Sequence, residues 1–300
     1  CPAILNNGTL TLTDATIQGA PSDTSTGTAS YAVNNDGVGS KLTANNTNIS
    51  GRGAIGATNG AKVEINGGTY HTPEVAWGHA IYAVNEGTEV VINDGTFSEG
   101  YAYSGNNWGM YQIYSGDKAK VTVNGGNFEA WDCANGYDLC TANDGVIEIY
   151  GGYFAEDPTN QNGKNYAATG YISIKISDEK YTVMKGIVDN GVNTYIIENA
   201  DDLKHIAEIV DAGATLKDEV VRLDADIILP EENWNPIGDN RTDMAFSGTF
   251  DGQDHLISGA KISGDFCWDG SVYGSKEGWG LFSVLDGATV KNVKLDNEVF

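Results

Sequence analysis

The stretch that decides the fold of this 300-residue chain is Val90-Val91-Ile92-Asn93-Asp94-Gly95-Thr96-Phe97. It joins a short apolar run to a polar turn and then to one aromatic residue. The same order returns at residues 63–70, 121–128 and 147–154, each time ending in Tyr or Phe. Because a unit that recurs along a chain is the signature of a stacked repeat architecture, we interpret the stretch as one turn of a β-solenoid.

The repeats align on the last apolar residue of each unit. These anchors are Ile17, Ile49, Tyr70, Phe97, Phe128 and Phe154. Before each anchor, alternating apolar residues such as Val63 and Ile65 give the period of two that a half-buried strand requires. Asn-Gly, Asp-Gly and Gly-Gly pairs supply the positive φ at which a coil turns a corner. We expect Val91 or its neighbour, together with Phe97, to point inward.

The same Asn-Gly pairs are also typical of β-hairpins, which would give an antiparallel sandwich. A sandwich does not require every unit to repeat one order of strand, turn, strand, turn and aromatic residue, whereas a stacked coil does. The repeats therefore favour parallel stacking over residues 1–155. Burial of each stacked anchor would stabilise the coil by about 1.5–3 kcal/mol, and differences in turn length would emerge as loops.

Beyond residue 155 the pattern changes. Residues 171–176 and 181–184 predict a pair of strands that finishes the first coil. Residues 199–213 predict one amphipathic helix, because apolar residues follow helical spacing and Gly213 ends it. We therefore predict an all-β fold of two coil segments joined by a strand pair and this helix. The predicted domains are residues 1–186 and residues 187–300.

The second coil resembles a known family. The segments that carry the resemblance are Trp234-Asn235-Pro236-Ile237-Gly238, Phe246-Ser247-Gly248-Thr249-Phe250-Asp251-Gly252, Gly280-Leu281-Phe282 and Ala288-Thr289-Val290-Lys291-Asn292-Val293. Over about residues 194–300 this series resembles the GLUG-motif family of bacterial surface proteins. The resemblance implies a right-handed parallel β-helix in large secreted or wall-attached, adhesin-like proteins. The chain departs from the family pattern at Gln253-Asp254 and in the long segment 265–276. Residues 1–155 resemble pectate-lyase-like β-helices in architecture.

Charge narrows the classes of partner. The chain has 17 basic and 41 acidic residues, for a formal net charge of -24. Nucleic acid is excluded as a partner, because no basic patch could neutralise its phosphates. No apolar run is long enough for a transmembrane helix, and strong acidity is typical of a soluble extracellular protein. Because the chain starts at Cys1 and stops inside a repeat, we expect it to be part of a longer protein.

The loops between turns carry most of the aromatic residues that we expect to be exposed. The candidate ligand-binding residues are Trp77, Tyr101, Tyr103, Trp108 and Trp131. Flat apolar rings on such loops would stack on the pyranose faces of a glycan. The alternative is that these rings cap the ends of the apolar stack.

Patterns for catalysis and metal binding are weak. Glu64 and Glu89 stand near equivalent positions on neighbouring turns, but they alternate with apolar residues and so belong to a solvated strand face. No Gly-x-Ser-x-Gly elbow occurs, and residues 251–255 lack the spacing of an EF-hand. We predict no catalytic residue and no resident cofactor, with Ca²⁺ at acidic turns kept as a candidate. Cys133 and Cys140 would close a small loop as a disulfide in an oxidising compartment, or lie buried as thiols.

Three functions remain as hypotheses. The first is a non-catalytic, extracellular adhesin-like or structural module at a bacterial surface, which presents loops to glycans or host proteins. The second is a polysaccharide lyase or glycosidase built on a β-helix. The third is a fibre or spike module of a bacteriophage.

Overall fold

The structure is a computed structural model that describes residues 2–20, 31–72, 78–99, 111–129, 138–161, 163–230, 234–239, 244–259 and 280–296. Within these ranges the chain is mostly β, with long parallel sheets and the helix α1 (Ala200–Asp211). It divides into two compact units, which we call unit 1 (Cys1–Thr169 with Glu179–Val183) and unit 2 (Gly170–Asp178 with Met184–Phe300).

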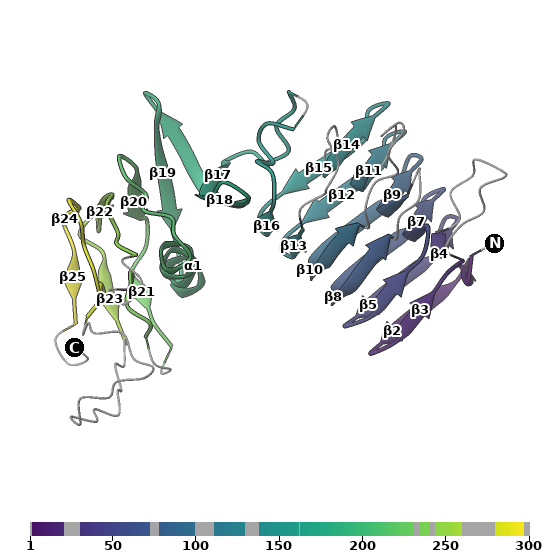
Figure 1. Cartoon of the computed structure of the whole chain (residues 1–300), viewed down its shortest axis with the longest axis horizontal. Helices are drawn as coiled ribbons and strands as arrows, with labels where there is room; N and C mark the ends of the chain where they lie inside the picture. Colours follow the sequence, from purple (N-terminus) through teal and green to yellow (C-terminus); the bar gives the residue numbers. More distant parts are fainter. Residues whose placement is uncertain are drawn as a thin grey trace. The chain divides into compact units, whose positions relative to one another are not determined.

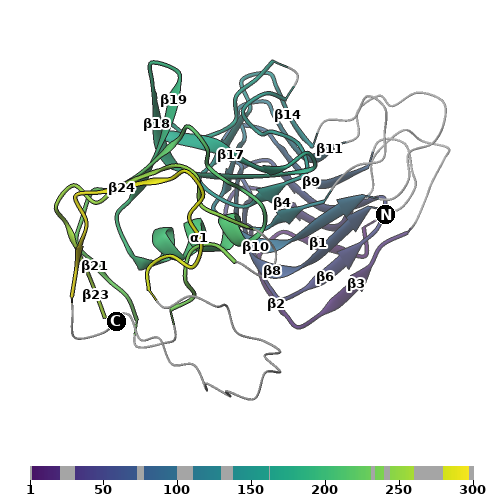
Figure 2. The same cartoon turned by 60° about the vertical axis from the view of Figure 1, so that its left-hand side comes forward.

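Unit 1 stacks successive strands of the chain in parallel (Figure 1). One sheet, which we call sheet 1, has the order β1 (Ile4–Asn6), β4 (Tyr31–Asp36), β7 (Gly53–Thr58), β9 (His79–Val84), β11 (Tyr111–Gly116) and β14 (Leu139–Ala142). The other, sheet 2, runs through β2 (Thr9–Thr13), β5 (Lys41–Asn45), β8 (Lys62–Thr72), β10 (Glu89–Glu99), β12 (Lys120–Val123) and β15 (Val146–Ile149). The short strands β3 (Thr16–Gln18), β6 (Asn48–Ser50), β13 (Asn127–Phe128) and β16 (Tyr153–Phe154) extend this second stack. Every turn of the coil adds one strand to each sheet, as expected for a parallel β-solenoid-like fold. The two sheets form separate faces of the stack (Figure 2).

Strand register places the anchors of the repeats in one inward column. Phe97 pairs with Tyr70 on one side and Phe128 on the other, and Phe128 pairs with Phe154. The ring centroids lie 5.0, 4.7 and 4.7 Å apart along this column, and each ring is at most 1% exposed. The predicted anchors are therefore confirmed as a stacked aromatic core. On β10 itself the inward residues are Val90 and Ile92, the neighbours of Val91.

A second column is polar and follows the C-terminal ends of the sheet 2 strands. The side-chain amide of Asn66 donates to Asn45 at 2.9 Å, that of Asn93 to Asn66 at 2.7 Å, and that of Asn124 to Asn93 at 2.8 Å. An amide has both donors and an acceptor, so Asn66 and Asn93 each bond to the turn before and the turn after. Asn59 takes a positive φ of 54° between β7 and β8, and each of these strands pairs in parallel with strands of other turns, so this Asn-Gly pair turns a corner of the coil and does not close a hairpin.

Interrupting this ladder should weaken unit 1. Because Asn93 both donates and accepts in the ladder, we expect Asn93→Ala to lower the free energy of unfolding by about 1–2 kcal/mol. Urea denaturation followed by circular dichroism measures the change. Asn7→Ala makes the same replacement at an exposed residue of the first turn and should cost less than half as much. Equal losses for the two variants would contradict a stabilising role of the ladder.

The predicted strand pair is present. β17 (Tyr171–Ser177) pairs with β18 (Lys180–Asp189), which begins in unit 1 by pairing antiparallel with β16. The second part of β18 pairs antiparallel with β19 (Val192–Ile197), the first strand of a new stack.

Unit 2 resumes the parallel pattern after the helix. β19 is followed by β20 (Val220–Leu223), β22 (Thr249–Asp251) and β24 (Thr289–Lys291), and a smaller sheet contains β21 (Ile227–Ile228), β23 (Leu256–Ser258) and β25 (Lys294–Leu295). Helix α1 begins after Asn199, whose side chain accepts from the backbone N–H of Asp202 at 3.0 Å, and Gly213 follows it at a φ of 117°. Its buried residues include Leu203 and Ile206. The amphipathic helix is thus confirmed within one or two residues at each end.

Candidate functional site

Four segments outside the described residues fall at one and the same connection of the coil. Residues 21–30, 73–77, 100–110 and 130–137 each follow a strand of the sheet 2 stack and precede a strand of sheet 1. The candidate ligand-binding residues Trp77, Tyr101, Tyr103, Trp108 and Trp131 all lie in these segments, outside the described residues. Their proposed role therefore stays a prediction. So does the disulfide, because Cys133 lies in the last of these segments.

The sheet 1 strands that these segments enter carry a cluster of stacked rings. The aromatic cluster consists of Tyr31, His79, Tyr82, Tyr111 and Tyr114. Tyr82 lies 5.2 Å from Tyr31 and 5.2 Å from Tyr114, and the ring planes differ by 20° and 11°. His79 stacks on Tyr82, Tyr111 and Tyr114 at 5.5–5.7 Å. Four consecutive strands of sheet 1 therefore share one aromatic surface.

Two glycines make room for the first ring of the cluster. Tyr31 is on β4 and Tyr82 is on β9, with β7 between them. A Cβ atom at Gly53 would lie 2.3 Å from Cδ1 of Tyr31, and one at Gly56 would lie 2.7 Å from Cδ2. Because neither position has a side chain, the ring of Tyr31 lies over β7 and reaches Tyr82. The stack thus depends on two residues that contribute no ring.

The histidine of the cluster is neutral at physiological pH. His79 is 7% exposed, and its Nδ1 accepts a hydrogen bond from the backbone N–H of Tyr111 at 3.2 Å. Burial lowers the pKa of His79 to about 4. The neutral ring therefore carries its proton on Nε2.

The phenols of the cluster stay protonated over the same pH range. Burial raises the pKa of Tyr82, and the nearby carboxylate of Asp117 adds to the shift. Burial also raises the pKa of Tyr111 to about 12, helped by the hydrogen bond between its hydroxyl and the sulfur of Cys140. Burial likewise raises the pKa of the Cys140 thiol. The cluster is thus an uncharged surface that offers O–H donors within a strongly acidic chain.

The opposite side of the same connection carries a polar pair. His71 on β8 and Ser98 on β10 occupy paired positions of neighbouring turns, and Nδ1 of His71 lies 3.1 Å from Oγ of Ser98. Glu129 follows on the next turn, where its backbone N–H donates to the carbonyl of Phe97. A hydroxyl within hydrogen-bond reach of an imidazole is the starting arrangement for nucleophilic catalysis.

The carboxylates of sheet 2 are not equivalent to one another, contrary to expectation. Glu64 of β8 pairs with Val91 of β10. Glu89 of β10 pairs with Lys62, which is two residues before Glu64 on β8. Glu89 forms an ion pair with Lys62 at 2.7 Å, and Glu148 forms one with Lys120 at 2.7 Å. Alternating charges on an exposed strand face are a structural feature, and they supply no acid pair of the kind a glycosidase needs.

A buried carboxyl group lies where residues 130–137 enter sheet 1. Asp138 is 1% exposed, and its Oδ1 accepts a 3.3 Å hydrogen bond from Nε2 of Gln112. Its Oδ2 is buried with no hydrogen-bond partner among the described residues. Burial, reinforced by the neighbouring Glu156, raises the pKa of Asp138 to about 8. Sequence patterns gave no sign of this group, because a single Asp next to a turn-rich segment is typical of a solvated residue.

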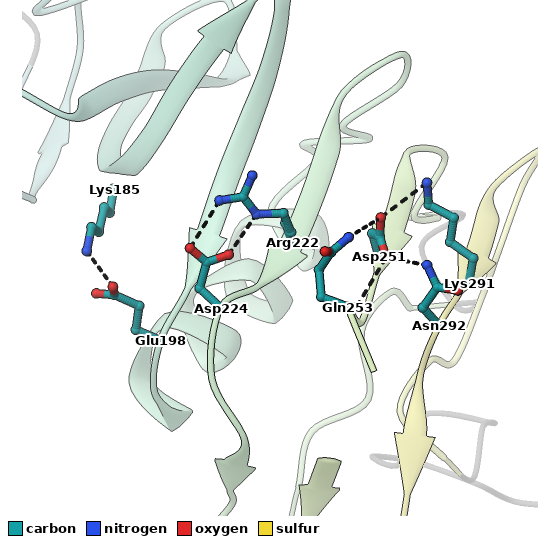
Figure 3. A network of polar contacts seen from close by, with 8 residues as sticks. All are labelled: Lys185, Glu198, Arg222, Asp224, Asp251, Gln253, Lys291 and Asn292. Atoms are coloured by element: carbon teal, nitrogen blue, oxygen red, sulfur yellow. Dashed lines mark hydrogen bonds and ion pairs between the residues drawn. The ribbon is translucent and has the colours of Figure 1, made fainter. Parts of the chain in front are cut away.

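Unit 2 has its own polar network, drawn in Figure 3. Arg222 and Asp224 form a two-pronged ion pair with distances of 2.7 and 3.0 Å. Asp251 accepts from Asn292 at 2.9 Å and from Gln253, and it pairs with Lys291 at 3.1 Å. Burial alone would raise the pKa of Asp251, but these donors outweigh it and lower the pKa to about 2.

This network should stabilise unit 2 at neutral pH. A depressed carboxyl pKa contributes stability that is present above about pH 4 and is lost as the pH falls toward 2. We expect Asp251→Asn to lower the free energy of unfolding of unit 2 by about 1.5–3 kcal/mol at pH 7, because an amide N–H₂ would face the donors of Gln253 and Lys291. The loss should shrink at pH 2–3. Asp218→Asn, at an exposed residue, is the matched control, and a pH-independent loss at Asp251 would contradict the assignment.

Two negative findings apply to the part of the chain that the structure describes. No three His, Cys, Asp or Glu side chains in it are grouped so that they could hold a metal ion. No helix in it is long and apolar enough to cross a membrane.

Comparison of the chain with protein-family models, with curated proteins and with solved structures gave no match. The resemblance to the GLUG-motif family therefore stays a prediction.

Proposed function

We propose that the chain is a non-catalytic module of an extracellular, right-handed parallel β-helix with an adhesin-like role at a bacterial surface. One observation carries the proposal: strands β4, β9 and β11 of sheet 1 bring the five rings of the aromatic cluster together in one stack. Stacked strands fix the scaffold, so connections at one corner are free to vary in length and sequence without disturbing it. Repeats of this kind are suited to displaying a long binding surface.

Charge and ring chemistry support glycans or host proteins as partners. The net charge of -24 disfavours nucleic acids and anionic surfaces. The five rings of the cluster, and the six aromatic residues in the segments that precede strands of sheet 1 in the sequence, give this part of the chain the composition of a carbohydrate-binding protein.

A glycan array that also carries host matrix proteins tests the proposal. We expect the wild-type chain to bind at least one class of ligand, and Trp108→Ala/Trp131→Ala to lose most of that binding. Tyr150→Ala, at a 37%-exposed tyrosine after the last strand of sheet 2, is the control and should bind normally. A blank array would remove the binding role. Light scattering measures the oligomeric state and so tests the alternative of a phage fibre, because a fibre module would be a trimer.

A second candidate function, ester hydrolysis, is favoured by the Ser98–His71 contact alone. Oγ of Ser98 would attack an ester carbonyl carbon while His71 takes the hydroxyl proton and passes it to the departing alcohol, and water would then release the acid. Hydrolysis of p-nitrophenyl acetate tests this, with Ser98→Ala inactive and Ser50→Ala, on the other side of His71, active. Activity equal to buffer for the wild-type chain would remove this candidate.

A further inference from the structure

The outer edges of the aromatic cluster form a row with a regular repeat. Tyr82 and Tyr114 occupy paired positions on β9 and β11, and their centroids lie 5.2 Å apart. Tyr31 continues the row at another 5.2 Å, although it is only 7% exposed, whereas Tyr82 and Tyr114 are half-buried. The spacing between Tyr82 and Tyr114 arises because neighbouring parallel strands stack at about 4.8 Å, whereas Tyr31 is two strands from Tyr82 and reaches it by lying over β7. Any ligand that contacts successive phenols in the same way must itself repeat along the stacking direction.

We propose that Tyr82 and Tyr114, together with the carboxylate of Asp117, bind an uncharged, extended β-1,4-linked glycan that lies along the stack. This inference rests on the proposed glycan-binding function and names its ligand class and a site. In an extended β-1,4-linked chain, each sugar advances the chain by a distance close to the spacing of the phenols. An α-linked glycan coils into a helix and cannot keep this register over more than one ring.

The chemistry of the row matches that of a neutral sugar. The rings of Tyr82 and Tyr114 stack on each other, so each half-buried ring offers a sugar its exposed edge and its hydroxyl, while its faces contact other rings of the cluster. The phenol hydroxyls are protonated and both donate and accept hydrogen bonds. The carboxylate of Asp117 is held by the side-chain amide of Asn143 at 2.8 Å and accepts from sugar hydroxyls.

Charge near the row selects against acidic glycans. Burial raises the pKa of both Tyr82 and Tyr114, and the negative charge of Asp117 adds to the shift at each phenol. His79 carries no charge at physiological pH. The nearest lysine on the same strand connection, Lys118, pairs with Glu86 at 3.4 Å. A uronate at Tyr82 and Tyr114 would therefore meet the carboxylate of Asp117, whereas the cations Arg52 and Lys164 act on Tyr31 and Cys140 instead.

Isothermal titration calorimetry with three soluble ligands tests the inference. The probes are cello-oligosaccharides of two to six sugars, maltohexaose, and oligogalacturonate of six sugars. We expect affinity to rise with length up to about three or four sugars for the cello-oligosaccharides, and to be at least about tenfold weaker for maltohexaose and oligogalacturonate. Equal affinity for cellohexaose and maltohexaose, or tighter binding of oligogalacturonate, would overturn the assignment of the ligand class.

Variants locate the site and separate the two proposals. Tyr82→Ala/Tyr114→Ala should weaken cellohexaose binding at least about tenfold, and Tyr82→Phe/Tyr114→Phe, which keeps the ring stack, should lie between it and the wild type. Tyr150→Ala should bind as the wild type does, and thermal melting verifies that each variant is folded. Unchanged binding in both tyrosine pairs, with loss in Trp108→Ala/Trp131→Ala, would overturn this inference and leave the proposed function standing. No glycan binding by the wild-type chain would overturn this inference, and an array on which neither glycans nor host matrix proteins are bound would overturn the proposed function as well.

Discussion

Replacing Phe97 by alanine is expected to lower the free energy of unfolding of unit 1 by about 3–5 kcal/mol. The ring is fully buried and stacks on Tyr70 at 5.0 Å and on Phe128 at 4.7 Å, so its removal leaves a cavity between two turns of the coil. Phe97→Asp should prevent unit 1 from folding, because a carboxylate would be buried in the column without a partner. Urea denaturation measures the first effect, and loss of a cooperative transition shows the second.

The matched control lies six residues away on the same strand. Val91 points to the outer face of β10 between Glu64 and Thr122, so Val91→Ala and Val91→Asp should each cost about 1 kcal/mol or less. If Val91→Asp were as damaging as Phe97→Asp, the assignment of inward and outward positions would be wrong.

Asp138→Asn is expected to stabilise unit 1 by an amount that grows with pH. The pKa of Asp138 is about 8 in the folded chain, against about 3.9 for an unfolded Asp. A raised pKa means that the contribution of the group is fully favourable below about pH 4 and is lost as the pH rises to about 8. Each pH unit in that window costs at most about 1.4 kcal/mol. Asparagine has the same shape and no charge, so it avoids this loss.

The quantity to measure is the free energy of unfolding of Asp138→Asn minus that of the wild-type chain. Free energies of unfolding at pH 4, 6, 8 and 9 should show no gain for Asp138→Asn at pH 4, a gain that grows to several kcal/mol at pH 8, and no further change at pH 9. Titration of His79 makes both proteins more stable as the pH rises from about 4 to 6.5. This effect is the same in the two proteins, so it does not change the difference between them. Asp117→Asn, at an exposed carboxylate, should show no such trend. A gain that does not vary with pH would contradict a neutral buried carboxyl.

Local sequence patterns were sufficient to predict the stacked strands and the helix. The recurrence of Phe97, Phe128 and Phe154 after alternating apolar residues predicts which residues stack, because inward positions in every turn must be apolar. The helix was predictable for a similar reason, since its capping residue and apolar spacing are contained within fifteen residues. Both the stacked positions and the helix could be predicted because the residues that define them lie close together in the sequence.

Register between turns was not predictable from the same patterns. The turns differ in length by up to eleven residues, and each difference must be absorbed in a connection before the next strand begins. For that reason Glu64 and Glu89 look equivalent in the sequence but pair with Val91 and Lys62. The asparagine ladder had a signal in the sequence, because Asn66, Asn93 and Asn124 are each the fourth residue of the repeats 63–70, 90–97 and 121–128.

The sequence by itself therefore determined that the chain stacks in parallel and which side chains face inward, because burial repeats with the period of the strands. Only the tertiary structure decided which outward residues meet. Tyr31 reaches Tyr82 because Gly53 and Gly56 leave the strand between them bare. Asp138 is kept neutral because the coil buries it beside Gln112 and Glu156. Contacts of this kind join residues that are 18 to 51 positions apart, and their geometry exists only after the turns have stacked.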